Sequence, residues 1–281
     1  MIRGLKLTVL ADDCVREAGL LAEHGLSFMI EADGFRLLFD TGQGDVLLHN
    51  ARGMGCSLEN LEAIVISHGH YDHTGGLADV LRLPGRPAIF VRPSATEDKF
   101  ARSATGLSRR IGMPEAARKT LEEVSSRVVW TRKTTELTPA VAVTGEVPRK
   151  HPLEDVGGPF FRDAACQVPD PLVDDQALWI ETTAGLVVVL GCAHSGVINT
   201  LDHIRCLTGG QELCGLVGGT HLQRASRERL EATGGILGRL NTQVIAPCHC
   251  TGLDAQVYFR ARFASRVQEC GTGAQLKFAS P

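Results

Sequence analysis

The sequence has 281 residues, of which 43% are hydrophobic and 22% charged, which is ordinary for a globular protein with a sizeable core. The formal net charge of -3 disfavours a nucleic-acid surface built on a general excess of basic residues. No stretch approaches the ~20 apolar residues that a membrane-spanning helix needs. The nine cysteines are odd in number, which excludes a complete disulfide framework and favours reduced thiols in a cytoplasmic protein.

The first half of the chain alternates short apolar runs with helical patterns. Strands are predicted at Leu5 to Leu10, Leu26 to Glu31 and Phe35 to Phe39, the last two joined by a turn at Ala32 to Gly34. A helix follows at Val46 to Met54, a strand ending near Ile66, a helix at Gly75 to Leu83 and a strand at Ala88 to Val91. Strand, loop, helix and strand make a βαβ-like unit in this region.

Residues from about 92 to 133 are polar and basic, with a helical pattern between Pro114 and Val124. We interpret this segment as an insertion. It is either a solvated surface excursion or a lid whose cations bind an anionic substrate. The second alternative makes Arg109 and Arg110 candidate substrate-binding residues.

The second half again gives strands followed by helices. Predicted strands are Leu178 to Glu181, Leu186 to Leu190, Leu213 to Val217 and Val244 to Ala246, and predicted helices are Val197 to Leu207 and about Ser226 to Leu240. The first two strands form a hairpin. Two halves of mixed strands followed by helices indicate an αββα sandwich with polar residues at one edge of the paired sheets. We expect a single domain over residues 1–281.

The segment from Ser67 to Leu77 carries the most chemical information. It places His68, His70, Asp72 and His73 directly after the apolar run Ala63 to Ile66. Imidazole nitrogen and carboxylate oxygen suit zinc, iron or manganese. His68 and His70 share one side of an extended segment and can reach one ion. Asp72 and His73, just before a helix-starting Thr-Gly-Gly turn, can reach a second.

This segment resembles the His-x-His-x-Asp-His signature of the metallo-β-lactamase superfamily. Further similarity lies in Asp40-Thr41-Gly42, Asp174 to Leu178, Gly191 to His194, Gly218 to Leu222 and Cys248 to Gly252. These motifs together resemble the branch named after the dihydropterin–ribofuranosylaminobenzene phosphate synthase of methanopterin synthesis. The resemblance covers roughly Leu5 to Gly252 and implies the αββα sandwich, with two mixed sheets flanked by helices, and its metal site.

The resemblance also implies the remaining metal ligands. His249, after the last core strand, would complete the second metal shell. Neighbouring side chains of an extended segment point to opposite sides, so Cys248 and Cys250 are predicted to pack away from the site. Cys192 falls where most hydrolases of the superfamily have a bridging aspartate. Either Cys192 occupies that position as a thiolate, or His194 reaches a metal and no protein ligand bridges the ions. We predict that His194 coordinates an ion and that Cys192 does not. Their side chains would share a face of a regular strand, so this prediction requires a turn at Gly191-Cys192 that leaves only one of them facing the ions.

Three more residues are candidates for the rim of the site. Asp175 stands near the position where the superfamily supplies a histidine ligand, and is either a ligand, a residue supporting the substrate site, or a turn-capping carboxylate. His221 is either a general acid, a hydrogen-bond donor to a substrate phosphate, or a surface turn residue. His24, near another strand end, is a weaker candidate for substrate binding.

The first functional hypothesis is a hydrolase in which two divalent ions, zinc before manganese or iron, activate a water molecule. The ligands would be His68, His70, Asp72, His73, His194 and His249, and the small-molecule substrate an anionic phosphoester. Asp72 and His221 would be the catalytic residues. The alternatives are a Lewis-acid synthase that joins a dihydropterin to an aminobenzene ribosyl phosphate, and a non-enzymatic ligand-binding scaffold. The sequence is compatible with a homo-oligomer.

Overall fold

A computed structural model describes residues 1–279 and contains two large β-sheets. The first sheet has seven strands in the order β16-β1-β2-β3-β4-β5-β8. Its strands are β16 (Gln275–Ala279), β1 (Gly4–Ala11), β2 (Ser27–Ala32), β3 (Phe35–Phe39), β4 (Ala63–Val65), β5 (Ala88–Val91) and β8 (Val128–Trp130). The strands from β16 to β3 are antiparallel, and those from β3 to β8 are parallel. The predicted βαβ unit is the parallel pair β4 and β5.

The second sheet has six strands in the order β15-β14-β13-β12-β10-β9. Its strands are β15 (Val244–Cys248), β14 (Leu213–Gly219), β13 (Gly185–Leu190), β12 (Leu178–Thr182), β10 (Val141–Val143) and β9 (Thr135–Thr138). The predicted hairpin is β12 and β13, which pair in register from Leu178 with Val189 to Thr182 with Gly185. Strands β13, β14 and β15 are parallel. Their near-continuous burial explains why they appear in the sequence as uninterrupted apolar runs.

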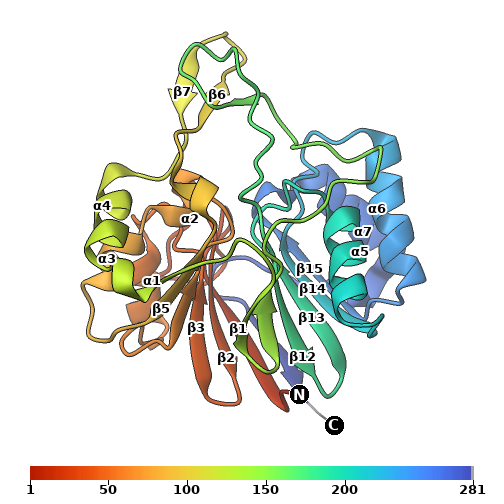
Figure 1. Cartoon of the computed structure of the whole chain (residues 1–281). Coiled ribbons are helices and arrows are strands. Elements are labelled where there is room, and N and C mark those ends of the chain that lie inside the picture. Colours follow the sequence, from red (N-terminus) through yellow and green to blue (C-terminus); the bar gives the residue numbers. More distant parts are fainter. Residues whose placement is uncertain (280–281) are drawn as a thin grey trace.

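The two sheets pack face to face, and helices cover their outer faces (Figure 1). Over the first sheet lie α1 (Leu47–Gly53), α3 (Leu77–Leu81) and α4 (Glu115–Glu123), and over the second lie α5 (Val197–Leu207), α6 (Arg227–Arg239) and α7 (Leu253–Phe263). The central core joins residues of both sheets, such as Val9 and Phe39 with Val187 and Val189. Two further apolar clusters lie beneath the two helical layers. This arrangement confirms the αββα sandwich.

The predicted insertion at 92–133 is only partly separate from the sandwich. Strand β8 pairs with β5 in the first sheet, and α4 buries Ala117 and Leu121 against the core beneath that helical layer. The part that projects is a small sheet of β6 (Phe100–Arg102), β7 (Ser108–Arg110) and β11 (Phe160–Phe161). It stands above the edge where the two large sheets meet, and we call these three strands the arm (Figure 1).

The longest helix among residues 1–279 is α6, with 13 residues. Within this part of the chain no helix combines the length and the apolar character needed to cross a bilayer.

Candidate metal centre

The loop that carries the first histidines is held rigidly at the end of β4. The Gly69 N–H donates to Asp174 Oδ2 over 2.7 Å, and a Cβ on Gly69 would lie 2.0 Å from the carbonyl oxygen of Ala95. Helix α2 (Tyr71–Thr74) begins directly after His70 and contains both Asp72 and His73. The helical turn thus starts earlier than the Thr-Gly-Gly turn where we expected it, and it brings Asp72 and His73 to the same edge as His68 and His70.

His68, His70 and His194 form the first group of facing imidazoles. His68 Nε2 lies 2.9 Å from His70 Nδ1, and the ring centroids of His68 and His70 are 4.8 and 4.9 Å from that of His194. Among the described residues, the buried Nε2 atoms of His70 and His194 have no hydrogen-bond partner. Burial lowers the pKa of all three side chains well below the ordinary value, so the neutral form that coordinates metal is favoured.

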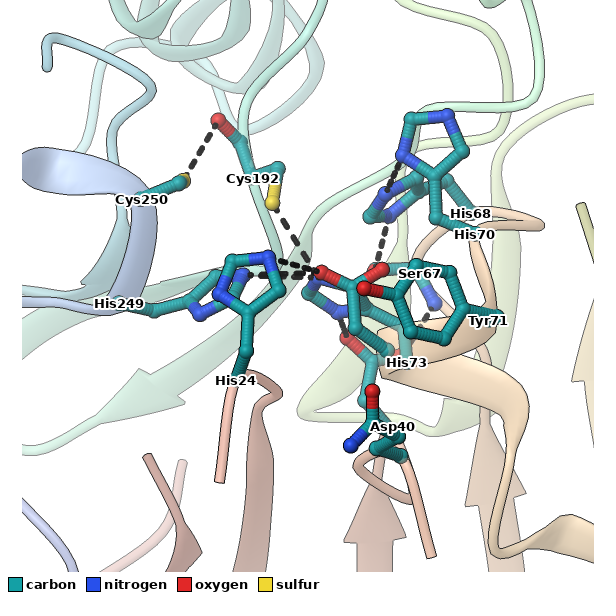
Figure 2. Close-up of polar contacts among 12 residues, drawn as sticks. His24, Asp40, Ser67, His68, His70, Tyr71, His73, Cys192, His249 and Cys250 are labelled. Carbon is teal, nitrogen blue, oxygen red and sulfur yellow. Dashed lines mark hydrogen bonds and ion pairs between the residues drawn. The ribbon is translucent and has the colours of Figure 1, made fainter. Parts of the chain in front are cut away.

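Asp72, His73 and His249 form the second group, of which Figure 2 labels His73 and His249. His73 Nε2 lies 3.3 Å from His249 Nε2, and Asp72 Oδ2 lies 3.6 Å from His249 Nε2. Burial opposes protonation of His249, yet hydrogen bonds to Asp13 and Asp72 raise its pKa well above the ordinary value. The acidic surroundings therefore stabilise a positive charge at this position.

Carboxylates behind the second group fix the orientation of its imidazoles. Asp40 Oδ2 accepts a hydrogen bond from His73 Nδ1 over 2.7 Å, and Asp13 Oδ1 accepts one from His249 Nδ1 over the same distance. Asp40 is itself held by the N–H and hydroxyl of Ser67, at 2.7 and 2.6 Å. Each imidazole thus presents Nε2 to the site, as in carboxylate–histidine–metal arrangements.

Cys192 lies between the two groups. Its Sγ is 3.2 Å from His73 Nε2, and its sulfur lies within 4.8 Å of donor atoms of His68 and His194 on one side and of His73 and His249 on the other. The argument that only one of Cys192 and His194 could face the ions was wrong. Residues two apart share one side of an extended chain, and both side chains reach the site, although the left-handed Ala193 (φ +54) lies between them.

The residues present fit divalent transition-metal ions. Zinc–nitrogen bonds of about 2.0–2.1 Å in a tetrahedral site place two ligand nitrogens about 3.3 Å apart. The nitrogens that face each other at 2.9 and 3.3 Å are close to that spacing. Buried nitrogens without partners, a carboxylate and a thiol are together the donor set that zinc, iron and manganese take from proteins.

A cavity of about 340 Å³ opens over both groups and is lined on one side by residues of the arm. Phe160 of the arm forms one wall, with its ring centroid 5.2 Å from that of His70 and 5.3 Å from that of His194. Three arginines also line the cavity: Arg102, Arg109 and Arg224. Of these, only Arg109 was identified from the sequence.

Of the four residues expected to bind substrate, two line the cavity and two do not. His24 and Arg109 line the cavity; His24 Nε2 lies 3.3 Å from Asp72 Oδ2, and Arg109 Nη2 donates to the hydroxyl of Tyr71 over 3.2 Å. Arg110 is not among the lining residues and pairs with Asp98 at 2.9 Å. Asp175 is buried, does not line the cavity, and accepts a hydrogen bond from the Ser195 N–H over 2.8 Å.

Two further residues line the cavity, and the sequence predicted this position for only one of them. His221 lines the cavity, as expected for a residue that acts there, and its ring centroid lies 4.4 Å from that of His194. Cys250 was expected to pack away from the site, but it also lines the cavity. A 3₁₀ turn (η3, His249–Thr251) with His249 at φ +50 breaks the alternation of side chains that the expectation assumed.

Several known proteins resemble this chain. The sequence pattern of the metallo-beta-lactamase superfamily matches residues 21–171. The 7,8-dihydropterin-6-methyl-4-(beta-D-ribofuranosyl)-aminobenzene-5'-phosphate synthase of Methanocaldococcus jannaschii is 28% identical over 99% of this chain and 98% of its own length. An uncharacterised protein of the same organism is 31% identical over 83% of this chain and 86% of its own length.

A solved structure extends the similarity to three dimensions. The crystal structure of a metal-dependent hydrolase of the β-lactamase superfamily covers 98% of this chain and 100% of its own, with a TM-score of 0.81 and 30% identity. The matched family pattern includes the loop from Ser67 to Leu77, and the structural match includes both sheets. The chain therefore belongs to the metallo-β-lactamase superfamily.

Proposed function

We propose that the protein is a metal-dependent hydrolase of a phosphoester. The observation that carries the proposal is the position of two adjacent ligand groups at the base of a cavity that three arginines line. His68, His70 and His194 would hold one divalent ion, and Asp72, His73 and His249 a second, with Cys192 between them. Zinc is the first choice from the donor set, and manganese or iron the others.

Ions in these positions supply Lewis acidity and lower the pKa of a water molecule toward ~7. The side chains of the protein contribute orientation and charge. Asp40 and Asp13 hold His73 and His249 in the tautomer that leaves Nε2 free. Phe160 covers His70 and His194 from the arm side and limits the access of bulk water.

The arginines favour an anionic substrate over a neutral lactam or thioester. Guanidinium groups bind phosphate oxygens through two parallel hydrogen bonds, so they position the group as well as attract it. Arg109 is held over the Tyr71 ring, with its Cζ 5.2 Å from the ring centroid. This contact directs the guanidinium toward the cavity beside Asp72, where a phosphoryl group would have to lie.

We predict that Arg109→Ala raises KM for a phosphodiester about 5- to 10-fold, since one charge-assisted contact is worth roughly 1–1.5 kcal/mol at an exposed site. Arg110→Ala is the matched control, because its guanidinium pairs with Asp98 and does not line the cavity. Steady-state kinetics on both variants, with metal content measured in parallel, provide the test. Equal effects of the two substitutions, or no effect of either, would remove the support that the arginines give to a phosphoester.

A second candidate is suggested by the full-length similarity to the M. jannaschii synthase. In this alternative the same cavity would bind a dihydropterin that carries a leaving group and an aminobenzene ribosyl phosphate. A carbon–nitrogen bond would form between them as the leaving group departs and the nitrogen loses a proton. Phe160 and Tyr71 provide aromatic surface in the cavity for flat rings. Mass spectrometry of a reaction with both compounds distinguishes the candidates, because only the synthase gives a product heavier than either substrate.

A further inference from the structure

A third cluster of donor atoms lies in the cavity beside the two ligand groups. It consists of Cys192, His221 and Cys250, whose sulfur and nitrogen atoms all lie within 4.8 Å of one another. All three residues line the cavity. His221 and Cys250 belong to neither of the two groups of histidines and Asp72, so the two ions of the phosphoesterase proposal leave these two side chains without a metal.

The two thiols of the cluster are not ordinary packing residues. Cys248 and Cys270, also buried, belong to the apolar core between the sheets. Cys192 and Cys250 belong to none of the three apolar clusters, although each is less than a tenth exposed. Gly219 leaves room for one of them, because a Cβ at that position would lie 2.7 Å from Cys250 Sγ.

Unusual backbone conformations direct the cluster into the cavity. His221 has φ +48 and His249, which precedes Cys250, has φ +50. Non-glycine residues rarely adopt this left-handed region, and such strain is concentrated at functional sites. Without the turn at His249, the alternation along β15 would point Cys250 toward the side of the sheet that Cys248 occupies.

The ring of His221 is fixed in place but incompletely bonded. Gly157, at φ +83, packs so closely against the ring that a Cβ there would lie 2.0 Å from His221 Cδ2. Within residues 1–279, the buried Nδ1 of His221 has no hydrogen-bond partner. A buried polar nitrogen without a partner is costly, and a ligand is one of the few ways to satisfy it.

We propose that Cys192, His221 and Cys250 bind a further divalent ion of the zinc type, in addition to the two ions of the histidine groups. Two sulfurs and one imidazole nitrogen form a ligand set known from catalytic zinc sites, which keep a fourth position open. All three residues line the cavity, so an oxygen of an anionic substrate group could take the fourth position. Cys192 would then be a ligand shared with the histidine groups, and His221 would hold the ion rather than contact the substrate.

Counting bound cobalt in the purified full-length chain tests this site. After removal of metals with a chelator, the protein is titrated with Co²⁺ by equilibrium dialysis, and the near-ultraviolet absorption from thiolate–cobalt bonds is recorded. The wild type should bind three equivalents. Cys250→Ser and His221→Ala should each bind two, and the absorption of Cys250→Ser should fall because one thiolate ligand is lost.

Cys206→Ser is the matched control, since Cys206 is an exposed thiol on α5. It should bind three equivalents with unchanged absorption. Circular dichroism verifies that each variant is folded, and His221→Ala provides an independent measure if Cys250→Ser is unstable. Saturation of the wild type at two equivalents, or three equivalents in both site variants, would overturn the proposal. The number of bound Co²⁺ ions is measured without substrate, so this test can fail or succeed independently of the test for phosphoester hydrolysis.

Discussion

Replacing His68 with alanine is expected to abolish nearly all phosphoester hydrolysis and to remove one equivalent of metal. His68 is fully buried, and its ring lies 4.5 Å from that of His70, 4.2 Å from that of His73 and 4.8 Å from that of His194. Loss of a residue that only orients a ligand typically costs about 10- to 100-fold in metal affinity or activity. We therefore expect a loss of at least about 100-fold in kcat/KM, measured after reconstitution with excess Zn²⁺.

His49→Ala is the control for this experiment. His49 lies on α1, away from the cavity, and its Nε2 bonds only to the carbonyl of Gly19 at 2.8 Å. It should keep wild-type metal content and kcat/KM within a factor of about two. Full metal content and retained turnover in His68→Ala would place the reactive site somewhere other than the His68 loop.

Replacing Lys99 with methionine is expected to lower the free energy of unfolding by about 3–5 kcal/mol. The Lys99 ammonium is 2% exposed and lies 2.8 Å from Asp174 and 3.1 Å from Asp170, both of them buried. Burial works against the charge, but the two carboxylates raise the pKa of Lys99 above its ordinary value. Methionine fills a similar volume, leaves Asp174 without the ammonium, and leaves Asp170 with its longer contact to Arg162 at 3.5 Å.

Urea denaturation of the chelator-treated protein measures this change without interference from bound metal. Lys119→Met is the control, because Lys119 pairs with Glu115 on the exposed face of α4 and should change stability by less than about 0.5 kcal/mol. Adding Asp174→Asn to Lys99→Met should recover part of the loss. A loss below about 1 kcal/mol, or none recovered in the double variant, would contradict a role for the buried charges.

This buried ion cluster also connects the arm to the metal loop. Lys99 immediately precedes β6, and Asp174 accepts the N–H of Gly69 between His68 and His70. The backbone adds a second connection, since the Tyr71 N–H donates to the carbonyl of Ile111 over 2.9 Å. The cavity wall and the ligands beneath it are thus built on one framework.

The parts of the site that the sequence predicted are those set by short-range spacing. His68, His70, Asp72 and His73 lie within one strand end and one helical turn, so their proximity does not depend on the rest of the fold. His194 and His249 were predicted because they match ligand positions that the family resemblance implies, and the parallel strands before them bring them to the same edge. The sandwich itself followed from apolar runs and helical patterns that were long enough to identify.

The parts that the sequence did not predict depend on single backbone angles and on distant pairing. In an extended chain Cys250 would point away from the site, but His249 adopts a left-handed conformation that no local pattern required. Ala193, between Cys192 and His194, is also left-handed, and the sequence did not predict that both of these side chains reach the site. Similarly, β11 joins the arm by pairing with β6, about 60 residues earlier. Phe160 could therefore not be assigned to the cavity before its strand was placed.

Arg109 and Arg110 also show that the sequence alone does not decide which side chains line the cavity. Arg109 and Arg110 lie next to each other on β7, so their side chains point to opposite sides of the arm. The sequence indicates that the two differ, but only the position of the arm decides that Arg109 lines the cavity and Arg110 pairs with Asp98.

The proposal that the protein is a metal-dependent phosphoester hydrolase is tested most directly by the activity of the metal-reconstituted protein. The measurement is kcat/KM for a phosphodiester, a phosphomonoester, a neutral thioester and a neutral lactam, each before and after chelation and after return of Zn²⁺ or Mn²⁺. We predict that a phosphoester exceeds both neutral substrates by at least about 100-fold, and that chelation abolishes turnover reversibly. Equal turnover of a lactam or thioester, or no phosphoester turnover by protein that carries its full metal content, would contradict the account.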